Sequence, residues 1–365
     1  MFVKQRVLVF SHELPPQGGG AGVVGLQYCS ELVESGFDVT VLTKKQSKYP
    51  IFLSSIKVIG VRYIPKIYLL PYYLKLRCID LSIYDHIVLN DMVSVYVAGF
   101  CFSEKELKKS ISVLHGSEPE MVYLSPDIFQ RLTGLTYFYN KAIQGARKIV
   151  AVSSYMKNKF LKETPFDNSG KIRIHYSKLG HDFYPMPSDP RVNKALRNEQ
   201  ILLSVSRIEK GKGFLQMYKI FKKLISINSS YKWIIIGDGG FKQEFETLVK
   251  FENLDSKIEF KDKMDRERLI KYYFIADVFW LLSEYKESFG LVYLEAQACL
   301  CPAIGYNKYG VRETINSGKT GFLVNSAEEC LDVLLNQGYK ALDKSDFSSF
   351  IKSMHSSTID GILND

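Results

Sequence analysis

The chain has 365 residues, of which 46% are hydrophobic and 24% are charged, so it is not a disordered chain and is long enough for two domains of roughly 150 to 200 residues each. The net charge of +9 suits a partner that is nucleic acid, an anionic membrane or a phosphorylated substrate. Nucleic acid is not expected, because no zinc-finger, helix-turn-helix or RNP-type pattern accompanies the basic residues.

The first half of the chain alternates β-rich apolar runs with turns or helical patterns. Strands are predicted within residues 6–11, 38–43, 86–91, 110–116, 148–154 and 171–180, and helices within 22–36 and 137–145. Because the runs are almost continuously apolar, they are typical of parallel strands that are buried on both faces and joined by crossover helices.

The same pattern restarts after residues 181–199, which are rich in proline and polar residues. Strands are predicted within 200–213, 232–240, 257–263, 277–283 and 301–306. We therefore expect an α/β protein of two doubly wound, Rossmann-like domains, residues 1–183 and 184–344, with a C-terminal helix at about 345–365 that packs back on the first domain. Ligands should bind in a cleft, at the carboxyl ends of both sheets.

The sequence predicts no membrane span, no signal peptide and no metal site. No apolar run approaches the ~20 residues of a membrane span, and the N-terminal QRVLVFS is too short and too polar for a signal peptide, so a cytoplasmic protein is expected. The six cysteines are interpreted as small buried thiols, because Cys299 and Cys301 have no second pair to complete a zinc site. Asp80, Asp85 and Asp91 are interpreted as surface or turn residues, so no metal is expected.

Residues 61–77, VRYIPKIYLLPYYLKLR, mix basic with large apolar side chains. This mixture is typical of a segment at a membrane interface, and a loop and helix packed on the core is the alternative. In the first interpretation the segment attaches the protein peripherally to an anionic membrane. Headgroups would meet Lys66, Lys75 and Arg77, while the interface would take up Tyr68, Leu69, Leu70, Tyr72 and Tyr73.

A glycine-rich loop at residues 15–22, PPQGGGAG, follows the first strand and opens the first helix. Gly18, Gly19 and Gly20 would let backbone N–H groups approach an anion at the helix N-terminus. The spacing is not that of a dinucleotide fingerprint, because Val23 stands where a glycine or alanine is needed. The loop is a phosphate-cradle candidate, and a tight turn is the alternative.

Two cations follow the first strand of the second domain in the sequence SVSRIEKGKG. Arg207 offers a planar fork of donors and Lys212 a mobile point charge, so together they can neutralise a diphosphate leaving group. A solvated basic turn is the alternative.

A helix is predicted over about residues 289–299, with Gly290 at its start and Pro302 beyond its end. Glu287 precedes it and Glu295 lies eight positions on, which is about 12 Å along a helix. One carboxylate at each end suits a nucleoside diphosphate sugar, in which one acid holds sugar hydroxyls, the other holds ribose hydroxyls, and helix N–H groups hold the phosphates. The alternative is that Glu287 interacts with the helix dipole and that Glu295 pairs with a neighbouring side chain.

The segment from Glu287 to Glu295 resembles the E-x7-E motif of retaining glycosyltransferases with the GT-B fold, and residues 296–325 resemble the block that accompanies it in glycosyltransferase family 4. The likeness extends over most of the chain and includes the family's Arg and Lys pair, its Gly-Asp-Gly turn at 237–239, its glycine loop, and its active-site histidine in VLHGSE. Two departures are Ser177, where relatives usually carry Asn, and Tyr309-Gly310, where many carry Gly-Gly.

The resemblance implies a retaining, metal-independent hexosyltransferase of the bacterial surface-polysaccharide type. Its donor would be a nucleotide-sugar, with UDP favoured and GDP next, and its acceptor a lipid-linked, lipopolysaccharide or other glycan hydroxyl at the inner face of the plasma membrane. Catalytic roles would fall to His115, Arg207, Lys212 and Glu287. Donor contacts would come from Gly19, Gly20, Arg207, Lys212, Gly237, Met264, Glu287, Phe289, Gly290, Leu291 and Glu295, and acceptor contacts from Gly116, Ser117 and Glu118.

A sugar-nucleotide epimerase of the same architecture and a non-catalytic sugar-nucleotide-binding protein are the competing interpretations. The E-x7-E block favours the transferase, and a C2 epimer among the products would favour the epimerase. Nothing in the sequence predicts the oligomeric state.

Overall fold

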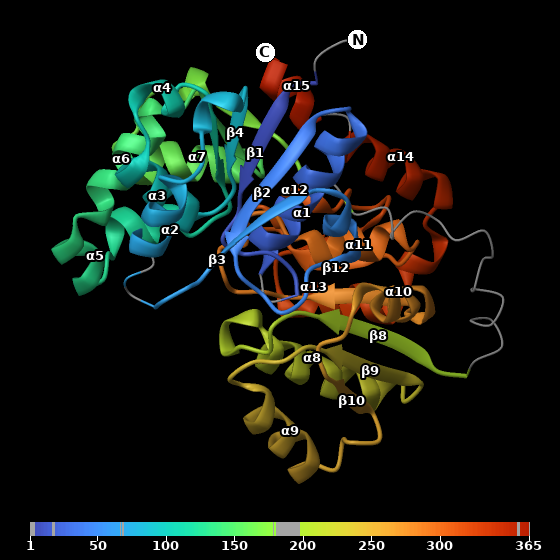
Figure 1. Cartoon of the computed structure of the whole chain (residues 1–365). Coiled ribbons are helices and arrows are strands. Elements are labelled where there is room, and N and C mark those ends of the chain that lie inside the picture. The colour runs from blue at the N-terminus through green and yellow to red at the C-terminus, as the bar shows by residue number, and fades with distance from the viewer. Residues whose placement is uncertain are drawn as a thin grey trace. The chain divides into compact units, whose positions relative to one another are not determined.

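The computed structural model describes residues 4–16, 19–65, 67, 69–177, 179, 198–355 and 358–364. The chain divides into two compact units (Figure 1), of which the first holds Met1–Lys178 and His355–Asp365 and the second holds Leu179–Met354. The predicted boundary at 183/184 and the linker at 184–197 lie outside the described residues. Each unit is an α/β domain built on one parallel sheet.

The first unit contains a seven-stranded sheet in the order β3-β2-β1-β4-β5-β6-β7. All of its pairings are parallel, with Val7 opposite Val39 and His86 in the register between β1, β2 and β4. The strands are β1 Arg6–Phe10, β2 Asp38–Lys44, β3 Lys57–Val61, β4 His86–Leu89, β5 Ser110–Leu114, β6 Lys148–Ala151 and β7 Ile172–Ile174. The helices are α1 Gly20–Glu34, α2 Leu69–Leu76, α3 Met92–Cys101, α4 Glu104–Leu107, α5 Ile128–Thr133, α6 Leu135–Gly145, α7 Ser154–Glu163 and α15 Ile359–Asn364.

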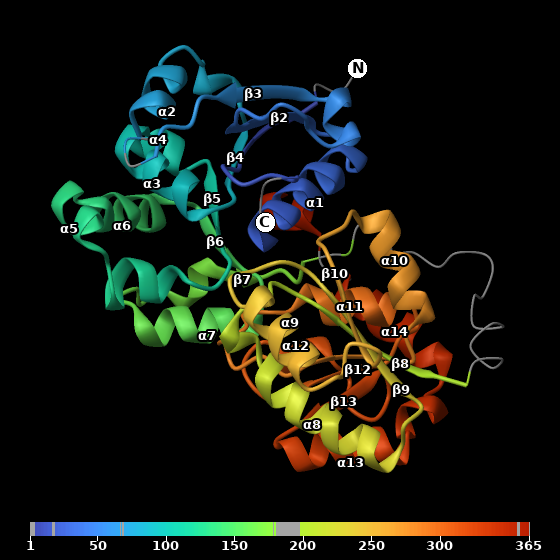
Figure 2. The ribbon, with the colours of Figure 1, turned by 90° about the horizontal axis from the view of Figure 1, so that it is seen from below.

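The second unit contains a six-stranded sheet in the order β10-β9-β8-β11-β12-β13, again parallel throughout. The strands are β8 Gln200–Val205, β9 Tyr231–Ile236, β10 Ile258–Lys261, β11 Val278–Leu281, β12 Ala303–Tyr306 and β13 Gly321–Val324. The helices are α8 Phe214–Ile227, α9 Lys242–Phe251, α10 Arg266–Ile275, α11 Leu291–Ala298, α12 Val311–Thr314, α13 Ala327–Asn336 and α14 Lys344–Met354. Figure 2 shows the helices that flank this sheet.

The apolar runs produce these sheets because a strand covered on both faces gains by burying every side chain. Strands β4, β5, β6, β11 and β12 are buried at every position. The order in each sheet reverses at its first strand, β1 or β8, with strands added on either side. The predicted fold of two doubly wound parallel-sheet domains is therefore confirmed.

Some elements differ from prediction. The edge strands β3 and β13 were not predicted. Two helices, α14 and α15, stand where one helix at about 345–365 was predicted. Helix α14 packs on α11 in the second unit, and only α15 belongs to the first. There the ammonium of Lys148 donates to the carbonyl of Ile362 at 3.1 Å, and Arg147 donates to the carbonyl of Leu363.

Two further features concern the surface of the described residues. Cys78 is exposed and Cys101 partly so, which corrects the prediction that all six thiols are buried. None of the helices in the described ranges is both long and apolar enough to cross a bilayer.

Candidate functional site

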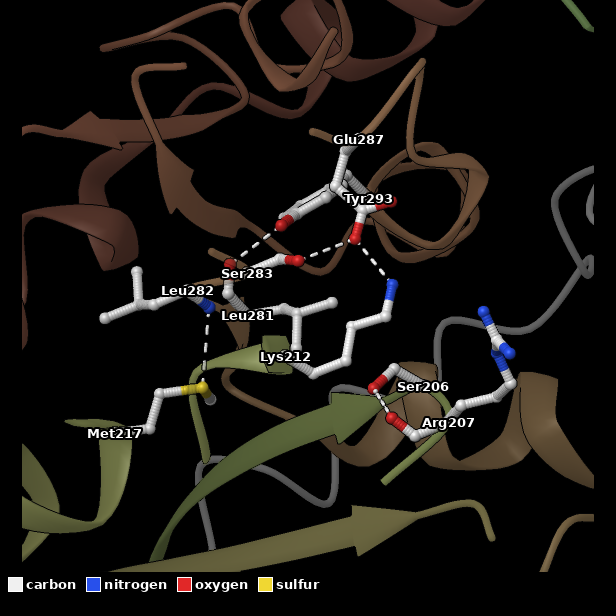
Figure 3. A network of polar contacts seen from close by, with 9 residues as sticks. All are labelled: Ser206, Arg207, Lys212, Met217, Leu281, Leu282, Ser283, Glu287 and Tyr293. Carbon is white, nitrogen blue, oxygen red and sulfur yellow. Dashed lines mark hydrogen bonds and ion pairs between the residues drawn. The ribbon is translucent and has the colours of Figure 1, made fainter. Parts of the chain in front are cut away.

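The second unit places Lys212 against Glu287 at the carboxyl edge of its sheet. Lys212 lies in the turn after β8 and Glu287 in the loop after β11, and these two strands are neighbours. The Lys212 Nζ lies 2.5 Å from the Glu287 Oε1, and the Ser283 hydroxyl donates to the same oxygen at 2.7 Å (Figure 3). The two charged side chains are only 13% and 19% exposed. The pair is thus a partly desolvated charge pair, in which each charge holds the other in position.

Arg207 stands apart from this pair. It follows β8 directly, its side chain is exposed, and Figure 3 shows its guanidinium separate from the Lys212–Glu287 contact. Its side chain makes no hydrogen bond or ion pair within the part of the chain that the structure describes. The structure therefore brings Arg207 and Lys212 to the same sheet edge, with the Arg207 charge available to an anion and the Lys212 charge shared with a carboxylate.

Close backbone packing fixes the turns that carry these residues. Gly213 has φ +78°, and a Cβ there would lie 1.9 Å from the carbonyl oxygen of Leu282. Gly237, after β9, has φ +150°, and a Cβ there would lie 1.9 Å from the carbonyl oxygen of Ser206. Only glycine fits both the backbone angles and the space. The Gly237 loop thereby supports the turn that presents Arg207.

Gly290 is the N-cap of helix α11, has φ +102° and provides no side-chain cap. The first residue of the helix is Leu291, so the helix is shorter at both ends than predicted. Phe289 is buried, and the N–H of Gly310 donates to the carbonyl of Glu287 at 2.9 Å. The Tyr309-Gly310 departure therefore lies directly on the backbone beside Glu287, and the positive end of α11 opens next to it.

Glu295 differs from Glu287 in its surroundings. It lies inside α11, is 8% exposed, and accepts a hydrogen bond from the Tyr273 hydroxyl of α10 at 2.9 Å. Burial raises the pKa of the Glu295 carboxyl, and the nearby charge of Arg266 opposes that rise. Glu287 is thus the accessible acid and Glu295 the enclosed one. Tyr273 was missed by sequence reasoning, because a tyrosine at a buried helical position carries no functional pattern.

Met264 follows β10 and lines a pocket of 520 Å³ on the second unit. Three basic side chains, Lys263, Arg268 and Lys271, share this lining, together with Asp262, Tyr272 and Ile275. Of the residues predicted to bind the donor, Met264 is the one that this pocket contains.

In the first unit, His115 follows β5, and a hydrogen bond to its ring holds the side chain in position. Its Nε2 lies 2.5 Å from the carbonyl oxygen of Asn90, so the Nε2–H donates and Nδ1 is the free acceptor in the neutral ring. Burial lowers the pKa of His115, although Glu118 opposes this. The neutral ring suits a residue that accepts a hydrogen bond from a hydroxyl group.

The three predicted acceptor residues have different environments. Glu118 is buried, and its carboxylate accepts the backbone N–H groups of His115 and Gly116, both at 2.6 Å. The buried Lys159 ammonium donates to the carbonyl of Gly116 at 2.5 Å and pairs with Glu120 at 2.7 Å. Ser117 alone is exposed. Glu118 and Lys159 therefore shape the loop that carries His115.

The glycine loop is connected through Glu13 to a buried acid, Asp91. The Gly19 N–H donates to Glu13 at 3.2 Å, and Asp91 accepts the N–H groups of Glu13 at 3.0 Å and Ser94 at 2.9 Å. Asp91 is 5% exposed and caps α3, so its interpretation as a surface or turn residue is wrong. Burial raises its pKa to about 6. Gly20 begins α1, and Gly18 lies outside the described residues.

The predicted membrane segment is only partly at the surface. Leu70 and Leu74 are exposed, as are Lys75 and Arg77. Tyr72 is fully buried, and its hydroxyl lies 2.9 Å from the Nδ1 of His12, so its prediction as an interfacial residue is wrong. The predicted roles of Lys66 and Tyr68 fall outside the described residues.

Comparison with known proteins gives two family matches. The model described as Glycosyltransferase Family 4 matches residues 18–177, and the model described as Glycosyl transferases group 1 matches residues 186–334. N-acetyl-alpha-D-glucosaminyl L-malate synthase of Bacillus anthracis is 27% identical over 84% of this chain and 81% of its own length. Alpha-monoglucosyldiacylglycerol synthase of Acholeplasma laidlawii is 25% identical over 69% of this chain and 66% of its own length.

Solved structures agree on the fold. The Anabaena protein Alr3699/HepE in complex with UDP-glucose has a TM-score of 0.76 at 17% identity, covering 99% of this chain and 100% of that one. This likeness shows that the two chains share an architecture.

Proposed function

Because the chain belongs to the family 4 glycosyltransferases with the GT-B fold, we propose that it transfers a hexose or N-acetylhexosamine from a nucleotide-sugar to a glycan or lipid-linked hydroxyl, with retention of configuration. A UDP-sugar is the favoured donor and a GDP-sugar the next. The names of the Bacillus relative and of the Anabaena complex, which mention N-acetylglucosaminyl and UDP-glucose, support this order.

The observation that carries the proposal is the pairing of Lys212 with Glu287 at 2.5 Å, beside the exposed Arg207. A diphosphate that is leaving a sugar develops negative charge, which the two cations stabilise. The carboxylate next to them accepts hydrogen bonds from sugar hydroxyls. One sheet edge thus offers charge complementary to a diphosphate and, beside it, an acceptor for a sugar.

Retention follows if the donor's own phosphate serves as the base. The bond from C1 to the phosphate oxygen breaks, the acceptor oxygen bonds to C1 on the same face, and the acceptor's proton passes to the departing phosphate. Positioning and charge stabilisation are then the protein's main contribution. The neutral His115 accepts a hydrogen bond at Nδ1 from a hydroxyl of the transferred sugar. The "alpha" in the names of both curated relatives supports retention, since common sugar nucleotides are themselves alpha-linked.

The acceptor class that we propose is lipid-linked, within a bacterial surface-polysaccharide or glycolipid pathway. The name of the Acholeplasma relative, a monoglucosyldiacylglycerol synthase, supports it. The net charge of +9 supports work at the anionic inner face of the plasma membrane. No divalent cation is required in this proposal, because Arg207, Lys212 and the N-terminus of α11 meet the charge of the diphosphate.

A donor panel tests the proposal. The purified full chain is incubated with UDP-glucose, UDP-galactose, UDP-N-acetylglucosamine and GDP-mannose, with and without EDTA, and nucleotide release is measured. We expect release from at least one UDP-sugar, equal in both conditions. Loss of release in EDTA with rescue by Mn²⁺ would contradict metal independence, and intact donors throughout would contradict the transferase.

A further inference from the structure

Large apolar side chains are exposed together on four helices of the first unit. Six of the seventeen large hydrophobic side chains that are exposed in the described residues lie on α2, α3, α5 and α6. Ile128, Leu132 and Tyr137 are the extreme cases, at 77%, 83% and 68% exposure. We call the set the apolar helix face, defined as Leu70, Leu74, Phe100, Ile128, Leu132 and Tyr137.

Aromatic contacts join α2, α3 and α6, and α5 packs on α6. Tyr73 of α2 packs on Phe100 of α3 with ring centroids 5.7 Å apart, and Phe100 packs on Phe138 of α6 at 5.1 Å. Tyr137 follows at 5.6 Å from Phe138. Figures 1 and 2 both show α2, α3, α5 and α6 gathered on one side of the unit. Ring contacts therefore link the exposed side of α2, α3 and α6, and α5 lies against the last of these helices.

Helix α5 is held with its apolar side outward. Asp127 caps its start, where Asp127 and Gln130 form a capping box, and Gly134 ends it with φ +67°. The Gln130 amide reaches the Tyr96 hydroxyl at 3.3 Å, which fixes the inner side of the helix. Ile128 and Leu132, four residues apart, then share the opposite side. A folded, capped helix that exposes two aliphatic side chains indicates a contact surface.

The charges on the four helices have one sign. They carry Lys75, Arg131 and Lys141 and contain no aspartate or glutamate within their bounds. Arg77 follows α2 and lies over the Tyr73 ring at 5.8 Å. The nearby acid Asp127 is engaged in its own cap. Helix α4, which packs on α6, carries the exposed Glu104. The four helices themselves combine exposed apolar groups with cations, which matches the apolar and anionic layers of a lipid interface.

We propose that the apolar helix face is where this protein contacts an anionic lipid bilayer, with α5 and the start of α6 inserted deepest. This inference rests on the proposed function, since it places the protein on the surface that carries a lipid-linked acceptor. The membrane contact predicted for residues 61–77 is thereby extended to a larger surface, to which α2 contributes together with α3, α5 and α6. Residues 128–137 supply the most exposed side chains of the apolar helix face.

Vesicle flotation of the full chain tests this surface, with vesicles of phosphatidylcholine alone or mixed equally with phosphatidylglycerol. Wild type should float with the anionic vesicles at low salt and be released as salt rises. The double variant Ile128→Asp/Leu132→Asp should bind at least about tenfold more weakly, because two aspartates replace the apolar anchors and repel the lipid. Lys75→Ala and Arg131→Ala should each weaken binding about fivefold.

The matched control is Ile227→Asp/Phe251→Asp in the second unit, whose parent side chains are 65% and 84% exposed. It should bind vesicles like wild type. Equal flotation of the two double variants, or a wild type that ignores anionic vesicles at low salt, would overturn the proposal. A dimer in sedimentation that Ile128→Asp/Leu132→Asp converts to monomer, without vesicle binding, would assign the face to a second copy instead.

Donor hydrolysis in solution separates this inference from the proposed function. If the apolar helix face behaves as expected while no nucleotide-sugar is turned over, the membrane surface stands and the transferase proposal fails. If donors are hydrolysed equally by both double variants but neither variant changes flotation, the membrane inference alone fails.

Discussion

Arg207 and Lys212 are cations of one turn, but they differ in their surroundings in the protein without ligand. Lys212 is held by Glu287, whereas the Arg207 side chain makes no hydrogen bond or ion pair in the described ranges. A diphosphate would meet Arg207 at once and would compete with Glu287 for Lys212. The two residues should therefore contribute to binding by different routes.

Arg207→Ala and Lys212→Ala should each weaken UDP binding. Loss of a charge-assisted hydrogen bond costs about 1.5 to 3 kcal/mol, which is roughly 10- to 150-fold in Kd. Lys210→Ala is the matched control, because Lys210 lies in the same turn and pairs with Glu244 at 2.9 Å on the surface. Titration calorimetry with UDP, GDP and ADP measures the effect. Unchanged binding of all three nucleotides in Arg207→Ala would refute the predicted clamp.

The two acids of the motif should have separable kinetic effects. Glu287→Gln should chiefly lower kcat, because an accessible carboxylate beside the cations acts near the reacting carbon. Glu295→Gln should chiefly weaken donor binding, because Glu295 is enclosed and bonded to Tyr273. Tyr273→Phe, which removes only that hydrogen bond, should share the direction of Glu295→Gln. Equal losses of donor binding at unchanged kcat in both glutamine variants would contradict this division.

Among the elements, the sequence predicts buried strands well, but it predicts edge strands, long-range ion pairs and buried caps poorly. Strands such as β4 and β11 are buried throughout and are predicted from their apolar runs. Strand β3 is a partly exposed edge strand, and β13 lies within residues 296–325, which are interpreted as a family motif. The pairing of Lys212 with Glu287 spans 75 positions, so only the sheet order brings them together. Asp91 was misread because a buried cap and an exposed turn acid follow a strand in the same way.

The loop after β9 supports the Arg207 turn, and a glycine substitution tests this support. Gly237→Ala should lower the melting temperature, with a backbone cost on the order of 1–3 kcal/mol, and should weaken UDP binding, because a Cβ would push against the Ser206 carbonyl at 1.9 Å. Gly240→Ala in the same loop is the control, since its Cβ would meet nothing closer than 3.7 Å. If the two alanine variants melt and bind alike, the support does not come from this contact.

For the whole molecule, the fold could be predicted from pattern and resemblance, but the surface could not. The composition of residues 61–77 predicts a membrane contact, yet Tyr72 is buried and the most exposed members of the apolar helix face lie at 128–137. Composition does not reveal which side of a helix faces the core, and capping decides it for α5. The net positive charge of the chain can be assigned to a surface only when α2, α3, α5 and α6 are seen together in the folded protein.

The stereochemistry of the first product tests the central claim most directly. Proton NMR would follow the sugar released or transferred from the preferred nucleotide-sugar, before mutarotation, with Arg207→Ala as the low-activity control. The account predicts a product with the anomeric configuration of the donor, together with free nucleoside diphosphate. A first product of inverted configuration, or a donor converted to its C2 epimer, would contradict it.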